Sequence, residues 1–157
     1  MGKEIERKYL VHQDRWDAHL KGSGIPYQQG YLLNTAEKIV RVRTAGSKGF
    51  ITIKGPVSGI TRTEFEYDIP LQDAQDLLQQ FCESVIHKIR HTLEHDGKAW
   101  EVDVFQGNNE GLIVSEIELQ SEDEIVVLPN WVDKEVSDDP RYFNSYLAEH
   151  PFKEWKE

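Results

Sequence analysis

Residues 4–8 read EIERK, so Glu4, Glu6 and Lys8 occupy every second position near the start of the chain. Successive side chains of a β-strand point to opposite faces, and these three charges would therefore share one face. RVR at 41–43, KIR at 88–90 and SEIE at 115–118 repeat the spacing with other charges. The pattern predicts strands that carry charges on one face and mostly apolar side chains on the other.

Eight segments are expected to form strands: Glu4–Leu10, Gln28–Leu33, Ile39–Thr44, Gly49–Lys54, Thr61–Ile69, Val85–Leu93, Lys98–Phe105 and Leu112–Gln120. Every one except the second carries at least a pair of charged or strongly polar residues at alternate positions. Turn signals such as Asp96-Gly97 are typical of hairpins between neighbouring strands. Because eight strands close readily into a barrel, the predicted fold is α+β, an eight-stranded antiparallel β-barrel with a few helices packed outside.

Helical spacing of apolar residues predicts a helix over Leu71–Phe81, directly after Pro70, and a second one starting at Asp139-Pro140. Two shorter helices are expected over Gln13–Leu20 and Ser121–Leu128. In the latter, Ser121 is the expected N-cap and three acidic residues follow it.

Composition limits what the chain can do. A length of 157 residues with 38% hydrophobic residues predicts one globular domain over 1–157. The formal net charge of −10 argues against general nucleic-acid binding, which needs a basic face. A single cysteine, Cys82, excludes an internal disulfide. The sequence shows neither a secretory signal nor a membrane helix, so a cytoplasmic protein with no membrane partner is expected.

The two faces of the barrel give two interpretations of the charged positions. An ordinary sheet would turn its charges to water, and the bare pattern leaves this alternative open. The density of charges in nearly every strand favours the other interpretation, in which they line the bore. Seven cations would then face seven anions, with Glu101 left out because its strand end is uncertain: Lys8, Arg41, Arg43, Lys54, Arg62, Lys88 and Arg90 against Glu4, Glu6, Glu64, Glu66, Asp103, Glu116 and Glu118.

Enclosing fourteen charges costs free energy unless they pair or bind something. A ligand rich in anionic oxygen satisfies the Arg and Lys side chains, and hard cations such as Mg²⁺ or Mn²⁺ satisfy the carboxylates. The bore therefore predicts a site for a phosphate-rich small molecule together with a divalent metal.

The ordered motifs EIERK, RVR, TIK (52–54), RTEFE (62–66), KIR, WEVD (100–103) and SEIE resemble the CYTH superfamily, the triphosphate tunnel metalloenzymes. The resemblance runs from residue 4 to about 147, and the segment Val132–Leu147 is similar to the C-terminal helix of short bacterial members. It implies a short bacterial protein of the inorganic triphosphatase type, and a homodimer is compatible with the family.

The resemblance also implies roles for individual residues. Metal binding is expected of the carboxylates Glu4, Glu6, Glu116 and Glu118, with Glu64 and Asp103 helping to hold metal or water. Triphosphate binding is expected of Lys8, Arg41, Arg43, Lys54, Arg62, Lys88 and Arg90. The expected catalytic set is Glu4, Glu6, Lys8, Glu64 and Asp103.

The activity implied is metal-dependent hydrolysis of tripolyphosphate to pyrophosphate and phosphate, with Mg²⁺ or Mn²⁺ as the cofactor. Three alternatives stay open: a class IV-type adenylate cyclase that converts ATP to cyclic AMP, a hydrolase of another organic triphosphate such as thiamine triphosphate, and a non-catalytic binder of polyphosphate or nucleotide. The same triphosphate clamp would serve each of them.

Overall fold

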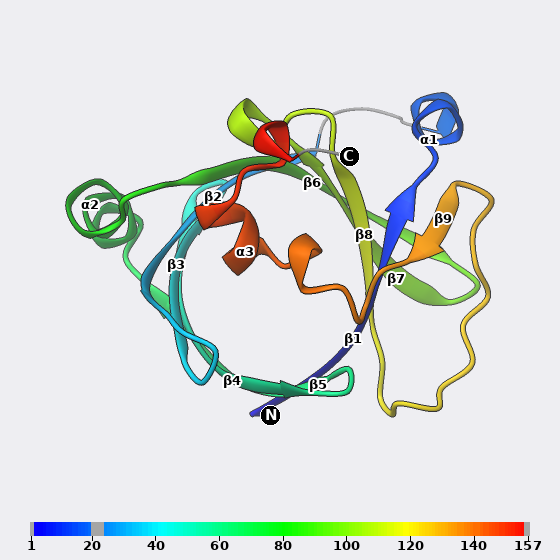
Figure 1. Cartoon of the computed structure of the whole chain (residues 1–157), viewed down its shortest axis with the longest axis horizontal. Helices are drawn as coiled ribbons and strands as arrows, with labels where there is room; N and C mark the ends of the chain where they lie inside the picture. Colours follow the sequence, from blue (N-terminus) through cyan, green and yellow to red (C-terminus); the bar gives the residue numbers. More distant parts are fainter. Residues whose placement is uncertain (1, 20–23, 156–157) are drawn as a thin grey trace.

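The computed structural model describes residues 2–19 and 24–155. Within them, eight antiparallel strands follow one another around a barrel in the order β5-β4-β3-β2-β6-β7-β8-β1, and β1 pairs back onto β5 (Figure 1). Their bounds are β1 Lys3–Val11, β2 Ile25–Asn34, β3 Ile39–Ala45, β4 Lys48–Ser58, β5 Thr61–Ile69, β6 Ile86–His95, β7 Lys98–Phe105 and β8 Ile113–Glu118. All eight predicted strands are present, which confirms the barrel.

A short ninth strand, β9 (Val132–Glu135), completes the edge of β1 that β5 leaves free. Residues Lys3–Ile5 of β1 pair with β5, whereas Tyr9 and Val11 pair with β9. The prediction that Val132–Leu147 resembles a C-terminal helix is therefore wrong for its first residues. The N-terminal half of β1 alone closes the barrel, and its other half needs a different partner for its backbone groups.

The predicted helix over Ser121–Leu128 is also wrong, because this segment forms a bend and a turn followed by irregular chain. The Ser121 hydroxyl donates to Asp123, and Glu124 accepts from the backbone N–H of Gln120, so these side chains stabilise a turn. Val126 packs against the apolar cluster outside the barrel.

Among the described residues there are three α-helices: α1 (Gln13–His19), α2 (Leu71–Phe81) and α3 (Asn144–Glu149). Three 3₁₀ turns cover Gly107–Asn109, Pro140–Tyr142 and Phe152–Glu154. The bounds of α2 are those predicted. The predicted helix Gln13–Leu20 is confirmed through His19, and Leu20 lies outside the described residues. The helix expected from Asp139-Pro140 is interrupted at Phe143, whose backbone is extended, so a 3₁₀ turn precedes α3. None of these helices is long and apolar enough to span a membrane.

Two apolar clusters lie on the outer surface of the barrel. In the first, Trp16 of α1 and Trp131 pack against the outward face of β1, β7 and β8, including Trp100. In the second, Ala74 and Leu78 of α2 cover Val42. These clusters place the apolar strand faces outside, as the sequence predicts.

A third apolar cluster lies inside the barrel, and this corrects the expectation that all helices pack outside. Leu147 of α3 packs against Ile86, Phe105, Leu112 and Val114. Ile86, Phe105 and Val114 share a strand face with Lys88, Asp103 and Glu116, so they point inward. Figure 1 accordingly shows α3 within the ring of strands. The C-terminal segment thus fills part of the bore with apolar side chains and leaves a charged cavity beside it.

Candidate active site

The charged faces of the strands surround a cavity of about 300 Å³ inside the barrel. Its charged lining comprises Glu4, Glu6, Lys8, Arg41, Arg43, Lys54, Arg62, Glu64, Glu66, Lys88, Arg90, Glu101 and Glu116. Two of the predicted site residues do not line it: Asp103 is buried behind the lining, and Glu118 is exposed at the end of β8. The structure therefore confirms that the charged strand faces line the bore. The alternative, a sheet that turns its charges to water, is excluded.

The strand register sets which charges face one another. Directly opposite pairs of opposite sign are Lys8 with Glu116, Arg90 with Asp103, Lys54 with Glu64, and Glu4 with Arg62. Across the β1–β8 ladder, however, Glu6 lies directly opposite Glu118. Like charges in this position repel each other and destabilise a sheet. The register therefore places both compensating and repelling charge pairs around the cavity.

One end of the cavity is built around Asp103, which is only 2% exposed. Arg90 donates to it through two nitrogens, Nε to Oδ1 and Nη2 to Oδ2, at 2.8 and 2.9 Å. Lys88 Nζ donates to Oδ2 at 2.8 Å. Burial alone would raise the pKa of Asp103, but the two neighbouring cations outweigh it and lower that pKa to about 2.

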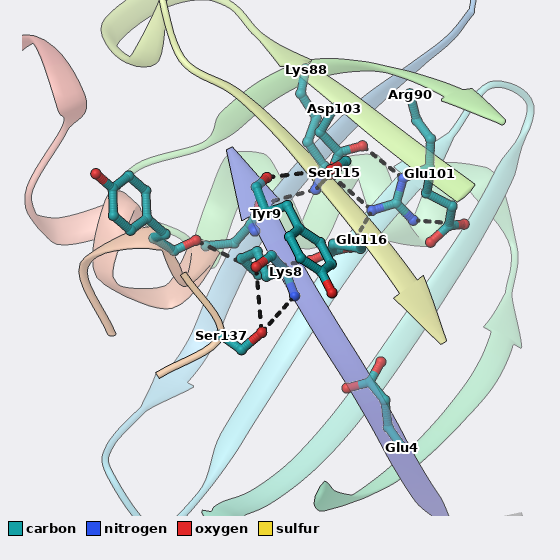
Figure 2. Close-up of polar contacts among 12 residues, drawn as sticks. Glu4, Lys8, Tyr9, Lys88, Arg90, Glu101, Asp103, Ser115, Glu116 and Ser137 are labelled. Atoms are coloured by element: carbon teal, nitrogen blue, oxygen red, sulfur yellow. Dashed lines mark hydrogen bonds and ion pairs between the residues drawn. The ribbon is translucent and has the colours of Figure 1, made fainter. Parts of the chain in front are cut away.

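Glu116 connects this group to β1, as Figure 2 shows. Its carboxylate lies 2.9 Å from Lys8 Nζ and 3.3 Å from Arg90 Nη2. Despite desolvation, these cations lower the pKa of Glu116 well below its usual value, so it stays ionised. Glu101, which the charge count leaves out, pairs with Arg90 at 3.3 Å and belongs to the cavity lining.

Positive charge is in excess at this end of the cavity. Arg43 forms no ion pair among the described residues, and burial together with Arg41 and Arg90 lowers its pKa to about 10. Burial lowers the pKa of Lys88 to about 7, because Arg90 and Arg43 repel its proton and Asp103 only partly compensates. Arg43, Lys88 and Arg90 therefore repel one another, and an anion entering the cavity would relieve this repulsion.

This arrangement predicts proton uptake on anion binding. At pH 8 Lys88 is largely neutral in the free protein, and a bound tripolyphosphate would raise its pKa, so binding should be accompanied by the uptake of about one proton. Calorimetric titration in two buffers of different ionisation enthalpy measures this number. The Lys88→Met variant serves as the reference that subtracts protons gained or lost by the ligand itself. Equal proton counts for both proteins would contradict the prediction.

Carboxylates dominate the opposite part of the cavity. Glu6 is half-buried and forms no ion pair within the described part of the chain; desolvation, Glu116 and Glu4 raise its pKa well above its usual value. Glu4 and Glu64 share Lys54, at 3.4 and 3.1 Å from its Nζ. A buried carboxylate among like charges is the environment in which a divalent cation binds most favourably.

Within residues 2–19 and 24–155, no three acidic, histidine or cysteine side chains are arranged to enclose a metal ion by themselves. Mg²⁺ does not require such a cage, because it usually retains waters and is held by one or two carboxylates plus substrate phosphates. The all-oxygen donor set around Glu6 therefore fits a hard divalent ion that binds together with its anionic substrate.

Several lining residues are not identifiable from the sequence pattern. Tyr27 and Tyr31 of β2 and Asn144 of α3 contribute to the cavity, and Gln29 lies fully buried beside it. The alternation Tyr27, Gln29, Tyr31 places these three on one strand face, but it lacks the charge that marks the other strands. Asn144 carries no signal, because its position depends on how the C-terminal segment folds into the barrel.

Relatives of known activity resemble this chain over almost its whole length. The CYTH domain family model matches residues 2–143. The inorganic triphosphatase of Acetivibrio thermocellus is 46% identical over 158 residues, covering 100% of both chains. That of Nitrosomonas europaea is 35% identical over 149 residues, covering 92% of this chain and 96% of the other.

Solved structures agree with these sequence relationships. A crystal structure of an inorganic triphosphatase superposes with a TM-score of 0.65 at 32% identity, covering 92% of this chain and 93% of that one. A protein from Pyrococcus horikoshii superposes with a TM-score of 0.57 at 18% identity, covering 76% and 80%, and shares the fold. With a family model that matches nearly the whole barrel and relatives this similar over their full length, the chain belongs to the CYTH domain family.

Proposed function

We propose that this protein hydrolyses inorganic triphosphate to pyrophosphate and phosphate with the help of a divalent metal ion. The observation that carries the proposal is one cavity inside the barrel with surplus cations at one end and a half-buried, unpaired carboxylate at the other. A pure anion receptor gains nothing from Glu6, whose charge would repel the ligand. The two relatives with the name inorganic triphosphatase support the same substrate.

The cations of the cavity bind and orient the phosphate chain. Arg43, Lys88 and Arg90 would hold the phosphate oxygens at the positive end, and Arg90 is itself fixed by Asp103. Lys8, Arg41, Lys54 and Arg62 extend this lining along the cavity. Holding the chain in one position converts hydrolysis into attack on a fixed phosphorus by a nearby water.

Preorganised cations also stabilise the reaction's developing charge. When the bond to the terminal phosphorus breaks, the leaving pyrophosphate gains negative charge on its bridging oxygen. Arginine and lysine side chains held by Asp103 and Glu116 meet that charge without rearranging, and such preorganised electrostatic stabilisation usually contributes most to an enzyme's rate enhancement. Asp103 is therefore proposed as a positioning residue, not as a group that touches the substrate.

The metal would be held by carboxylates from Glu4, Glu6 and Glu116, with Glu64 and Glu118 completing the proposed set. When bound, a divalent ion supplies charge neutralisation and a water of lowered pKa. Mg²⁺ and Mn²⁺ are the proposed ions because both prefer oxygen ligands.

Product analysis tests the proposal. Purified protein is supplied with Mg²⁺ or Mn²⁺ and, in parallel, with tripolyphosphate, ATP and thiamine triphosphate. The expected result is rapid phosphate release from tripolyphosphate, with EDTA abolishing it and the organic triphosphates used poorly. Cyclic AMP from ATP, faster hydrolysis of an organic triphosphate, or binding without turnover would each replace the proposed function by a different one.

A further inference from the structure

Strand β2 turns an uncharged face to the cavity, and one residue of that face is Gln29. Its side chain is 0% exposed although it carries two hydrogen-bonding groups. A buried amide destabilises the fold unless its donors and acceptor are satisfied. The contacts that satisfy Gln29 lead to the anion-binding end of the cavity.

Gln29 lies in a chain of hydrogen bonds between two cations. Arg43 Nε donates to Gln29 Oε1 at 3.2 Å. Gln29 Nε2 donates to Asn144 Oδ1 and to the Tyr31 hydroxyl, both at 3.3 Å. The same Asn144 Oδ1 accepts from Lys88 Nζ at 3.0 Å. Three strands and the C-terminal helix therefore meet through two neutral amides.

The donor-to-acceptor direction of these hydrogen bonds is fixed by the cation at each end. An ammonium group only donates, so protonated Lys88 requires the oxygen of Asn144 to face it. From Gln29, that oxygen can then accept a hydrogen bond only from the amide nitrogen. This leaves Gln29 Oε1 to accept from Arg43. The guanidinium of Arg43 likewise only donates, and the orientation of Gln29 is the one it needs.

The consequence concerns the two Nη groups of Arg43. Its Nε is used by Gln29, and the ring of Tyr27 lies 5.0 Å from its Cζ. Among the described residues no other hydrogen bond or ion pair involves this guanidinium, which lines the cavity. A carboxylate in place of Gln29 would fix Arg43 equally well but would neutralise it.

We propose that Gln29, held by Asn144, is a positioning residue that fixes Arg43 through Nε and leaves both Nη groups and the full positive charge for a phosphate of the substrate. This inference deepens the proposed function and rests on it. Phosphate binding by a guanidinium fork is bidentate and depends on its orientation. Loss of Gln29 should therefore weaken substrate binding through Arg43 and not through the fold.

A double-mutant cycle tests this coupling. Gln29→Leu and Arg43→Ala are made singly and together, and the dissociation constant of tripolyphosphate is measured by calorimetry alongside KM and kcat. Gln29→Leu is expected to raise the dissociation constant and KM about tenfold, with a much smaller change in kcat. In the Arg43→Ala background the same substitution should have no further effect. Gln28→Leu, on the exposed outer face of the same strand, is the matched control and should leave all three constants unchanged.

Two results would overturn the proposal: an effect of Gln29→Leu that persists undiminished without Arg43, or no effect on binding at all. Gln29→Met, which keeps the side chain unbranched, replaces Gln29→Leu if the latter does not unfold cooperatively, and failure of both to fold would reduce Gln29 to a structural residue. Turnover of tripolyphosphate by the wild-type protein distinguishes failure of this inference from failure of the proposed function. Without turnover of tripolyphosphate the hydrolase assignment fails, whereas the calorimetric cycle still measures the coupling.

Discussion

The Glu6→Gln variant is expected to lose about 100-fold or more of the triphosphatase turnover and, at the same time, to unfold at a higher temperature than the wild type. Glutamine keeps the shape of the side chain but removes the anion proposed to hold the metal. The variant's fold is expected to be more stable, because desolvation, Glu116 and Glu4 raise the pKa of Glu6 and make its ionised form unfavourable. Turnover of tripolyphosphate and thermal unfolding at neutral pH measure the two effects.

The pH dependence gives the sign of the stability change. A carboxyl group whose folded pKa is raised contributes stability below its unfolded pKa, and this stability is lost as pH rises through the folded pKa. The difference between Glu6→Gln and wild type should therefore disappear in acid. The exposed Glu83→Gln serves as control, with both properties unchanged. Full activity in Glu6→Gln would contradict the proposed metal site.

Opposite effects on stability and activity would explain why the barrel encloses so many charges. Paired groups such as Lys8 with Glu116 are compatible with a stable fold in the absence of ligand. Glu6 and Arg43 are different, since each lies half-buried in the cavity without an ion pair within the described residues. Natural proteins accept such local destabilisation where a ligand restores the balance.

The sequence predicts the barrel and most of the cavity because period-two alternation is local information. The bounds of β5 and β7 follow from it directly, and Arg62, Glu64, Glu66 and Glu101 on their inward faces line the bore. The register then decides which charges meet. Asp103 illustrates the limit: alternation places it inward, but only the pairing of β6 with β7 shows that Lys88 and Arg90 enclose it.

The C-terminal segment is the least predictable part of the chain. Apolar spacing in residues 142–147 indicates a helix, yet it does not reveal whether that helix packs outside the barrel or enters it. Leu147 packs against Ile86, Phe105 and Val114, whose inward positions look like breaks in the charge pattern when each strand is considered alone. Asn144 and the uncharged face of β2 become recognisable as parts of the site only after this docking.

Asp103→Asn is expected to destabilise the fold by about 3–5 kcal/mol, the cost of removing one partner from a buried ion pair. Asparagine retains the shape but leaves Lys88 with Asn144 alone, and Lys88 is only 1% exposed. Arg90 keeps Glu116 and Glu101, so the loss falls mainly on Lys88. Chemical and thermal unfolding at pH 7 measure the difference, with the exposed Asp68→Asn of β5 as the matched control.

Acid titration and a second substitution identify the cause of the destabilisation expected for Asp103→Asn. The cations around Asp103 lower its pKa to about 2, so its contribution is present above the unfolded pKa of 3.8 and is lost as pH falls through about 2. The gap between Asp103→Asn and wild type should therefore narrow over this range. Adding Lys88→Met to Asp103→Asn removes the buried amine that has lost its partner, and the double variant should be more stable than Asp103→Asn alone. If Asp103→Asn instead costs no more than Asp68→Asn, the ion pairs around Asp103 do not hold this end of the barrel together.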